Sequence, residues 1–347
     1  MKSVHLVIPD LFLPKDIAAE VCADLRLPAL EKLLARGRSE ILPALPLENH
    51  LCGLFGVPCQ ADAPVAPVSA AFDGLAEGCW LRADPVHLRL QRDQMLLAGV
   101  QPSDDEAALL CASLNEHFAG QGMEFFAPHP QRWYVRLDTL PRIRTIPFSA
   151  VLGGNVRRAL PTGEDAAHWH RMFNEIQMLL FAHPLNQSRE ERGELTVNSV
   201  WLWGAGDSRD VLQKTYEGTS SDELLVEMLA AAAGVPFSGW SSQWHDALSL
   251  TLSKRERGYS ADGRQLLVWT GLRSALQRGD LMAWHAALQD FETGYAQPLW
   301  QALRSGKLVQ LQLDVPGGHG IRRVILKRGD SWAFWRRTRR LAEYPLV

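Results

Sequence analysis

The sequence predicts an α/β protein with a doubly wound, largely parallel sheet flanked by helices and a small antiparallel element near the C-terminus. Predicted strands alternate with predicted helices along most of the chain, which is the pattern of successive βαβ units. The chain has 347 residues, of which 46% are hydrophobic and 22% charged, the balance of a globular protein with a core. This length accommodates one large domain or two of ordinary size.

The first third of the chain begins with a predicted buried strand. The apolar run Val4–Ile8 ends at a proline, and Asp10 follows it in a polar turn. Apolar residues at helical spacing predict a helix over Leu27–Ala35, and a second, short helix is expected over Asn49–Phe55. Residues 58–78 are rich in alanine, proline and glycine, so we expect an irregular connection there.

The middle of the chain contains one well-defined helix start. Ser103 and Glu106 have the spacing of a capping box, which predicts a helix from there to about His117. A strand over Val197–Trp203 is expected to enter a glycine-bearing loop at Gly204–Gly206. The other elements expected here are strands at Phe125–Phe126 and Trp133–Leu137 and a long helix over Glu164–Phe181.

The last third predicts two helices and a terminal group of strands. Helices are expected over Glu223–Ala233 and from the N-cap Asp280 to about Leu303, with a strand at Leu266–Trp269 between them. Antiparallel strands are expected within 307–340, at Leu308–Leu313, Arg322–Leu326 and Trp332–Trp335.

Composition and charge exclude several classes of protein. A net charge of −3 and a pI near 6.4 provide no overall attraction to nucleic acid or to an acidic membrane. The N-terminal apolar run is too short for a signal peptide, and no apolar stretch has the length that spans a bilayer. The five cysteines form no C-x-x-C pair, so we expect buried free thiols rather than a zinc ribbon. We therefore expect a cytoplasmic protein without a membrane partner.

A basic, aromatic segment near the C-terminus has two interpretations. Eight basic residues lie between Arg322 and Arg340, interleaved with Trp332, Phe334 and Trp335. Such a mixture can bind nucleic acid or a phosphorylated ligand. The alternation also fits an amphipathic edge strand whose charges face water and whose aromatic side chains pack on the domain. Because the whole chain is acidic, we favour the edge strand and expect no strong binding of nucleic acid.

Several motifs together are more distinctive than any single element. Residues 174–206 read NEIQMLLFAHPLNQSREERGELTVNSVWLWGAG. Together with HLVIPD near the start, CWLRADPVHL at Cys79–Leu88 and the W-x-F-W-R-R motif near the end, this stretch resembles the RpfE-type family of bacterial regulatory proteins. The resemblance covers nearly the whole chain. That family looks like a distant relative of cofactor-independent phosphoglycerate mutase, within the alkaline phosphatase superfamily.

The resemblance implies a single alkaline-phosphatase-like domain over residues 1–347, with active residues at the C-terminal ends of strands. Active members use two divalent metals and a serine or threonine nucleophile. Their first metal-binding aspartate follows the first strand, as Asp10 does here. The expected nucleophile position, just before the helix at Asn49–Phe55, has Leu47-Glu48-Asn49-His50 instead. Active members also have an Asp-His pair after a late strand, and no histidine of this chain follows an aspartate.

The resemblance thus implies that Asp10 is a relic metal ligand, while ordinary turn chemistry is the alternative for the same residue. One aspartate cannot hold two metals, so we expect a catalytically degenerate protein with a regulatory or ligand-binding role. The alternative is a divergent metal-dependent phosphomutase or phosphatase that acts on a phosphorylated small molecule with Mn or Zn. No cofactor is expected under the first hypothesis, and the partner is a small phosphorylated ligand or a protein.

Seven residues are candidates for ligand contacts. A strand of large side chains meets a glycine turn, where backbone can approach a ligand, so we name Asn198, Trp203, Gly204 and Gly206. The polar loop after the long helix contributes His183, Asn186 and Arg189. The alternatives are a core strand with a tight turn and a loop held by its own hydrogen bonds.

Overall fold

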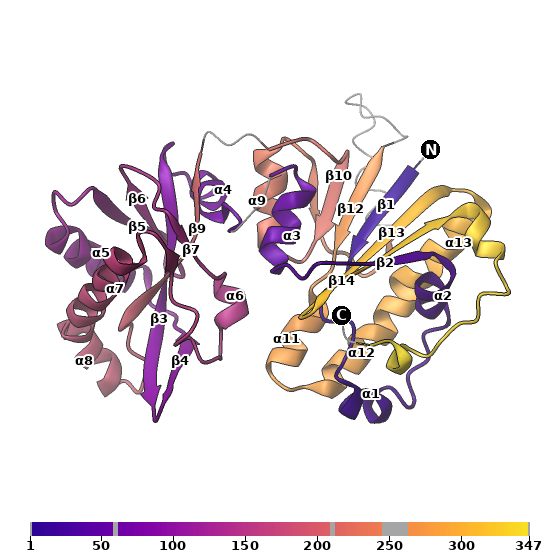
Figure 1. Cartoon of the computed structure of the whole chain (residues 1–347), viewed down its shortest axis with the longest axis horizontal. Helices are drawn as coiled ribbons and strands as arrows, with labels where there is room; N and C mark the ends of the chain where they lie inside the picture. Colours follow the sequence, from indigo (N-terminus) through magenta and orange to yellow (C-terminus); the bar gives the residue numbers. More distant parts are fainter. Residues whose placement is uncertain (1, 58–61, 209–211, 245–262, 346–347) are drawn as a thin grey trace. The chain divides into compact units, whose positions relative to one another are not determined.

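The computed structural model describes residues 2–57, 62–208, 212–244 and 263–345. They form two compact units (Figure 1): the first unit combines Met1–Leu47 with Lys214–Val347, and the second unit is Glu48–Gln213. The sequence led us to expect one domain over residues 1–347. The structure instead inserts the second unit into the first one, so that the first unit is built from two distant parts of the chain.

A seven-stranded sheet is the centre of the first unit, with the order β11-β10-β12-β1-β13-β14-β2. The strands from β11 to β13 pair in parallel, whereas β14 pairs antiparallel with both of its neighbours. The predicted α/β class, with a largely parallel sheet and a small antiparallel element near the C-terminus, is confirmed. The strands are β1 (Lys2–Val7), β2 (Arg38–Leu42), β10 (Gly218–Ser221), β11 (Phe237–Gly239), β12 (Arg264–Val268), β13 (Leu308–Gly317) and β14 (Gly320–Lys327).

Helices flank this sheet on two sides, as a doubly wound fold requires. From β10 the chain runs through α9 to β11, which is the neighbour of β10 at the edge of the sheet. From β12 it runs through α11, α12 and α13 to β13, which lies in the other direction, on the far side of β1. Right-handed crossovers that move in opposite directions place their helices on opposite faces. The helices are α1 (Lys15–Val21), α2 (Pro28–Arg36), α9 (Leu224–Ala232), α11 (Gly271–Gln277), α12 (Leu281–Phe291) and α13 (Gln297–Ser305), with the π-helical turn η2 (Glu292–Ala296) and the 3-10 turns η3 (Arg328–Trp332) and η4 (Leu341–Glu343).

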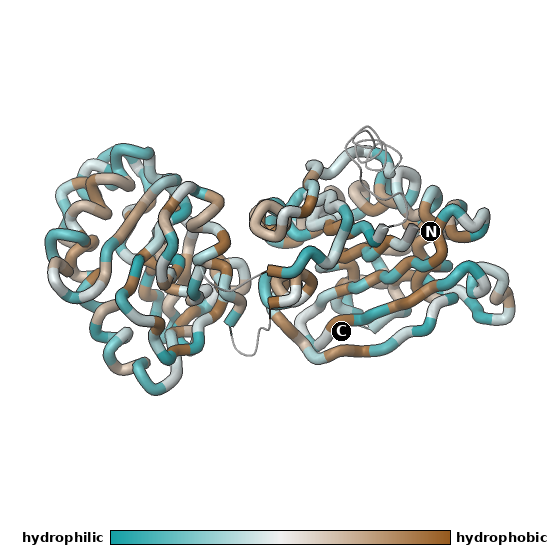
Figure 2. The backbone as a smooth tube through the Cα atoms, turned by 90° about the horizontal axis from the view of Figure 1, so that it is seen from above, coloured by the Kyte–Doolittle hydropathy of each residue, from teal (hydrophilic) through white to brown (hydrophobic). Residues whose placement is uncertain are grey.

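The main core of the first unit lies on one face of the sheet. Leu6 of β1 and Leu313 of β13 are register partners, and both side chains are fully buried on this face. They belong to one apolar cluster with Leu33 of α2, Trp284 of α12 and Leu303 of α13. Figure 2 shows the corresponding alternation of hydrophobic and hydrophilic segments along the strands. Burial of these side chains is the main contribution to holding the helices on the sheet.

The opposite face of the same strands carries a buried polar network, which we call the polar stripe. His5 lies between the Tyr216 hydroxyl, 2.8 Å from its Nδ1, and Asp314 Oδ2, 2.9 Å from its Nε2. Arg323 of β14 donates two hydrogen bonds to the Asp314 carboxylate, at 2.8 and 2.7 Å. Side chains of β1, β13 and β14 are therefore bonded to each other in addition to their backbone ladder. The members of the stripe are His5, Tyr216, Arg264, Gln312, Asp314 and Arg323.

An antiparallel sheet is the centre of the second unit. Strands β4, β3, β6 and β5 are neighbours in that order, and β9 also pairs with β3. All of these pairs are antiparallel. The strand expected at Val197–Trp203 therefore belongs to an antiparallel sheet, which the alternation of helices and strands did not predict. The strands are β3 (Cys79–Gln91), β4 (Gln94–Gly99), β5 (Met123–His129), β6 (Arg132–Leu137) and β9 (Ser199–Asp207), with a separate pair β7 (Ile143–Arg144) and β8 (Thr162–Gly163).

The helices of the second unit follow the sequence signals. The predicted capping box opens α5: the Ser103 hydroxyl accepts the Glu106 N–H at 3.2 Å, and the Glu106 carboxylate accepts the Ser103 N–H at 3.0 Å. Leu110 of this helix packs with Trp133 of β6 and Trp169 of α7 in the core of the unit. The helices are α3 (Leu47–Leu54), α4 (Val65–Phe72), α5 (Asp104–His117), α6 (Phe148–Val151), α7 (Ala166–Phe181) and α8 (Pro184–Glu191). In the parts of the chain that the structure describes, no helix has the length and apolar character needed to cross a bilayer.

Two segments expected to be irregular are ordered elements. The expected connection 58–78 contains helix α4, and its residues 58–61 lie outside the described part of the chain. The expected loop Gly204–Gly206 continues β9 instead. One extra residue of β9 lies opposite β3 at this point, and Gly204 has a φ of 69°, as in a β-bulge that begins with a left-handed glycine. The glycines therefore bend a strand rather than end it.

The expected third terminal strand, Trp332–Trp335, is absent from the described sheet. The chain leaves the sheet after β14 and enters the 3-10 turn η3. The free edge of β14 is taken by β2, so no neighbour remains for another strand there. Trp332, Phe334 and Trp335 are 59%, 81% and 67% exposed, so the expectation that they pack on the domain is wrong. Within 307–340, only β13 and β14 are strands among the described residues.

Candidate functional site

The parallel strands of the first unit end at one edge of the sheet, which is where open α/β sheets bind ligands. Asp10 follows β1, Asp222 follows β10, and Trp269 and Thr270 follow β12. Asp222 joins two of these strand ends, because its Oδ1 accepts the Thr270 N–H at 2.7 Å. This edge contains the predicted relic metal ligand, Asp10.

The surroundings of Asp10 fit an ion pair rather than a metal centre. Its φ is 61°, a backbone conformation that aspartate adopts more readily than most residues. The carboxylate Oδ2 lies 3.2 Å from Arg273 Nε, and the backbone carbonyl accepts a hydrogen bond from Trp284 Nε1 at 3.2 Å. A guanidinium and an indole N–H are donors, and neither ligates a metal. Nor does the described part of the chain contain a group of three His, Cys, Asp or Glu side chains placed to hold a metal ion.

Helix α3 begins where the resemblance implied a nucleophile. Glu48, Asn49 and His50 occupy its first turn and are buried. The Glu48 carboxylate accepts a hydrogen bond from the Ser149 hydroxyl. This turn therefore presents a carboxylate, an amide and an imidazole, but no hydroxyl of its own that could attack phosphorus.

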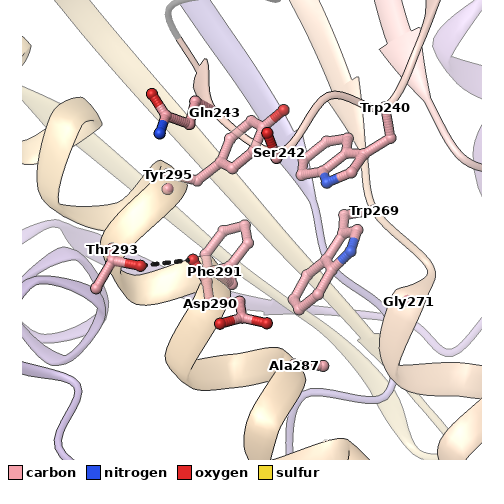
Figure 3. A pocket seen from close by; sticks show the side chains of 11 residues that line it. Trp240, Ser242, Gln243, Trp269, Gly271, Ala287, Asp290, Phe291, Thr293 and Tyr295 are labelled. Atoms are coloured by element: carbon pink, nitrogen blue, oxygen red, sulfur yellow. Dashed lines mark hydrogen bonds between the residues drawn. The ribbon is translucent and has the colours of Figure 1, made fainter.

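A cavity of about 460 Å³ lies at the strand ends of the first unit, and we call it the aromatic pocket (Figure 3). Four of its lining side chains are aromatic. Trp240 follows β11, Trp269 follows β12, Phe291 ends α12 and Tyr295 belongs to η2. The volume is within the range of small-molecule sites in proteins.

The four rings of the pocket are nearly parallel. Trp240 and Tyr295 stack with centroids 4.1 Å apart and planes 15° from parallel, and Trp269 and Phe291 stack at 4.5 Å and 12°. Between these pairs, the centroids of Trp240 and Trp269 are 6.1 Å apart at 18°, and those of Phe291 and Tyr295 are 5.6 Å apart at 6°. The pocket therefore has flat aromatic walls with one common orientation.

The π-helical turn η2 contacts α2 through one carboxylate. Glu292 is buried and accepts the N–H groups of Ala29 and Leu30, at 2.7 and 2.9 Å, in the first turn of α2. A carboxylate at a helix N-terminus satisfies unpaired N–H groups and interacts favourably with the helix dipole. The extra residue of a π turn shifts the helix register at this point. The turn thus brings Glu292 to α2 and places Tyr295 in the wall of the pocket.

The loop after β11 holds the other side of η2. The Tyr295 hydroxyl donates a hydrogen bond to the Ser241 carbonyl at 2.9 Å and lies 3.1 Å from the Ser241 hydroxyl. Gly294 passes close to the same loop, and a Cβ at this position would lie 2.5 Å from the Ser242 carbonyl oxygen. Glycine is therefore required where η2 packs on the loop that carries Trp240.

One carboxylate marks the polar side of the pocket. Asp290 is exposed, and its side chain lies next to Phe291 in the lining (Figure 3). Among the described lining residues it is the one that carries a charge, and the others with polar side chains include Ser242, Gln243 and Thr293. The described part of the lining therefore combines aromatic faces with a single acidic group and no basic group.

The ligand candidates after the long helix lie in the second unit and bond to their own surroundings. His183 is the N-cap of α8, and burial lowers its pKa. Asn186 is buried and exchanges two hydrogen bonds with the backbone of Val197, at 2.9 and 2.8 Å. Arg189 is buried and forms an ion pair with Glu106. These contacts tie α8 to α5 and to the segment just before β9, and the binding role of the three residues stays a prediction.

The candidates near β9 have similar partners. Asn198 exchanges hydrogen bonds with the backbone of Leu88 on β3, at 2.7 and 2.9 Å. Trp203 donates from Nε1 to the buried carboxylate of Asp84 at 2.7 Å. Arg82 donates to the same carboxylate, and its guanidinium lies 5.4 Å from the centre of the Trp203 ring. Asn198 and Trp203 therefore hold β9 against β3.

The two glycine candidates lie close to the segment around α4. A Cβ on Gly206 would lie 2.5 Å from the Pro64 side chain, and a Cβ on Gly204 would lie 3.4 Å from the Ala66 backbone nitrogen. The segment around α4, rather than a ligand, thus makes the close approach that we expected at these glycines. The structure places these glycines and the other five ligand candidates in the second unit, whereas Asp10 belongs to the first unit.

Sequence reasoning missed the four rings of the aromatic pocket. Two signals were present. Trp240 and Trp269 each come directly after a strand, at the end where parallel sheets bind ligands. Phe291 and Tyr295 are four residues apart in a predicted helix, so they share one of its faces. Neither signal shows that the two tryptophan rings stack on the rings of Phe291 and Tyr295.

Curated relatives of this chain are phosphoglycerate mutases. The chain is 25% identical over 196 residues to the 2,3-bisphosphoglycerate-independent phosphoglycerate mutase of Methanosarcina mazei, over 52% of this chain and 48% of the relative. It is 26% identical over 171 residues to the enzyme of the same name from Methanosarcina barkeri, over 46% and 43%. The match spans about half the length of these relatives. No protein-family model matches the chain.

Two solved structures share the fold. The cofactor-independent phosphoglycerate mutase of Thermoplasma acidophilum superposes with a TM-score of 0.50 at 14% identity, over 95% of this chain and 90% of that one. The PH0037 protein of Pyrococcus horikoshii superposes with a TM-score of 0.56 at 13% identity, over 94% and 87%. The chain therefore has an alkaline-phosphatase-like fold and is distantly similar to cofactor-independent phosphoglycerate mutase.

Proposed function

We propose that this protein is a catalytically degenerate, phosphoglycerate-mutase-like protein of the RpfE type, with a regulatory or ligand-binding role. The observation that carries the proposal is the ion pair between Asp10 and Arg273, whose atoms are 3.2 Å apart. It puts a fixed cation beside the carboxylate that the resemblance assigns to a metal. The first turn of α3, where Glu48 precedes Asn49 and His50, supports the proposal because it has no serine or threonine.

In this proposal the partner is a small phosphorylated ligand or a protein. We place the protein in the cytoplasm. Cys22 and Cys111 support that location because they are buried free thiols, a state that persists in a reducing compartment. Burial raises the pKa of Cys111 to about 12, so this thiol is unreactive at neutral pH.

The second candidate function is a divergent, metal-dependent phosphomutase or phosphatase that uses Mn or Zn. The observation that favours it is the 25% identity to a named phosphoglycerate mutase over 196 residues. That activity needs a metal site in which Asp10 is not paired with Arg273, since the guanidinium occupies one side of the Asp10 carboxylate.

Metal content and turnover separate the two candidates. Protein purified in Mn or Zn and then dialysed is analysed for bound metal, and turnover of 3-phosphoglycerate and of a chromogenic phosphate ester is measured with added Mn. We expect far less than one metal per chain and no turnover above that of Asp10→Asn. Arg278→Gln, a change of an exposed arginine near the end of the same helix, is the control for Arg273→Gln.

Stoichiometric metal with turnover that collapses in Asp10→Asn would overturn the degenerate assignment. Gain of metal binding in Arg273→Gln alone would support it, since removal of the guanidinium then restores the ligand role of Asp10. The Arg278→Gln control excludes a general effect of reduced positive charge.

A further inference from the structure

We propose that the aromatic pocket binds a planar heteroaromatic ring whose edge carries two adjacent N–H donors, the chemistry of a guanine base. The inference rests on the ligand-binding role proposed above and names the class of ligand. It combines three features of the described residues: parallel ring faces, their fixed positions and a single carboxylate beside them.

The parallel rings favour a flat ligand. Trp240, Trp269, Phe291 and Tyr295 are all within 18° of their stacked neighbours. A planar ligand that lies parallel to one of these rings is nearly parallel to the others as well. It can therefore stack on a second ring without losing its stacking on the first. Cages for compact cations such as choline surround the charge with ring faces, and a set of parallel planes does not do so.

The rings are held in place before any ligand arrives. Phe291 and Tyr295 are 2% and 1% exposed, and Trp269 is 6% exposed. The Tyr295 ring is fixed by its hydrogen bond to the Ser241 carbonyl, and the backbone N–H of Trp240 donates to the Ser221 carbonyl at 2.9 Å. Trp240 is partly exposed. Binding on such a surface loses little side-chain entropy.

Asp290 selects the edge of the ring. Its carboxylate is exposed at the pocket, and no hydrogen bond to its side-chain oxygens comes from the described residues. Two carboxylate oxygens match two adjacent N–H donors in a bidentate pair, as the amide and amino groups of guanine provide. Adenine presents an acceptor nitrogen beside its amino group on the corresponding edge, so one carboxylate oxygen would face a lone pair.

The charge of the lining decides against recognition of phosphate inside the pocket. No lysine, arginine or histidine belongs to the described lining, and Asp290 repels an anion. A nucleoside should therefore bind at least as well as its monophosphate. If the phosphate of a nucleotide is recognised, the groups that do so lie outside the described lining.

The test is titration of the full-length protein with guanosine, adenosine, guanosine monophosphate and choline, followed by calorimetry and by quenching of tryptophan fluorescence. We expect guanosine to bind more tightly than adenosine and no more weakly than its monophosphate. Trp240→Leu should weaken guanosine binding by at least about fivefold because a stacking face is lost. Asp290→Asn should weaken it by about tenfold or more because a charged acceptor is lost.

Matched controls are Trp335→Leu and Asp24→Asn, which change an exposed tryptophan and an exposed aspartate away from the pocket lining. Both should leave guanosine affinity unchanged. Because Asp290 is exposed, Asp290→Asn should fold normally even if Trp240→Leu does not. Equal effects of Asp290→Asn and Asp24→Asn would overturn the proposed role of the carboxylate.

Other outcomes separate this inference from the proposed function. Tighter binding of choline than of guanosine, or no guanosine binding up to millimolar concentration, overturns the inference. Thermal stabilisation by a different metabolite would then leave the ligand-binding role standing. Metal-dependent turnover together with guanosine binding through Asp290 would overturn the degenerate assignment and support the pocket.

Discussion

At the scale of single residues, Asp73 shows how the second unit stabilises a partly buried charge. Its carboxylate accepts hydrogen bonds from Arg132 Nε at 2.9 Å and Nη2 at 2.7 Å, and from the Tyr134 hydroxyl at 2.5 Å. Burial raises the pKa of Asp73, but these donors and the positive charge of Arg132 outweigh it, so the pKa lies below its ordinary value. The charged form is therefore stabilised by folding.

This shift predicts a pH-dependent contribution to stability. A carboxyl whose pKa is lower in the folded state contributes stability above its unfolded pKa of about 3.9, and the contribution is lost as pH falls through the folded pKa. Asp73→Asn should therefore destabilise the protein by about 1–3 kcal/mol at pH 7, and the difference from wild type should shrink below about pH 4. Thermal unfolding between pH 3 and pH 7 measures it, with the exposed Asp93→Asn as control. A deficit that is constant with pH would contradict this account.

The polar candidates named from the sequence differ from the pocket residues in one physical respect. Asn186 and Arg189 are buried and bonded to backbone and to Glu106, so their polarity is used inside the fold. Asp290 and Gln243 are exposed at the pocket lining. A sequence shows which residues are polar but not which of them face solvent in a cavity, because that depends on contacts between distant segments.

At the scale of elements, the C-terminal hairpin and the segment after it have opposite roles. Strand β14 is bonded to β13 on one side and β2 on the other, and Leu326 is fully buried in the core of the first unit. Trp335 is 67% exposed. These two segments could not be told apart from the sequence, since each belongs to an alternation of apolar and basic residues.

Substitutions should separate the two segments. Leu326→Ala should cost about 2–5 kcal/mol because it leaves a cavity between sheet and helices. Trp335→Ala should change the free energy of unfolding by less than about 0.5 kcal/mol, because the ring is on the surface. Urea unfolding measures both. A loss of more than about 2 kcal/mol for Trp335→Ala would mean that this ring packs after all, as the edge-strand hypothesis expected.

Local signals predicted elements well and long-range arrangements poorly. The start of α5 and the N-cap at Asp280 depend on residues three apart, so both could be inferred from sequence, and Asp280 does accept the Ala283 N–H at 2.9 Å. The π turn at Glu292 depends on Ala29 and Leu30, more than 250 residues earlier. No periodicity contains that information. Nor does periodicity predict the parallel rings of the aromatic pocket, because their residues lie on separate elements between positions 240 and 295.

At the scale of the whole molecule, the two units differ in how the chain builds them. The second unit is one continuous stretch, Glu48–Gln213, whereas the first unit needs residues from both sides of that stretch. The fold class was predictable because alternating elements are visible along the chain. The division was not, because an insertion between β2 and β10 leaves the same alternation of elements on both sides.

A truncated chain tests the independence of the units. A chain that ends at Lys307 lacks β13 and β14, which removes one neighbour of β1 and the only described neighbour of β2. We expect the first unit to lose its protected amides in 2–42, 218–244 and 263–268, while 79–207 stay protected. Hydrogen exchange with mass spectrometry measures this region by region. Loss of protection in 79–207 as well would show that the second unit depends on the first.

The central position of β1 has a consequence for the order of events on the ribosome. Among the described strands β1 is synthesised first, whereas its partners β12 (Arg264–Val268) and β13 (Leu308–Gly317) follow only after the whole inserted unit. Until β12 emerges, the backbone of β1 has neither of these partners, and an apolar strand with two open edges invites pairing with other chains. The inserted unit can fold in the meantime. The yield of native protein should therefore depend on keeping β1 protected until the last strands emerge.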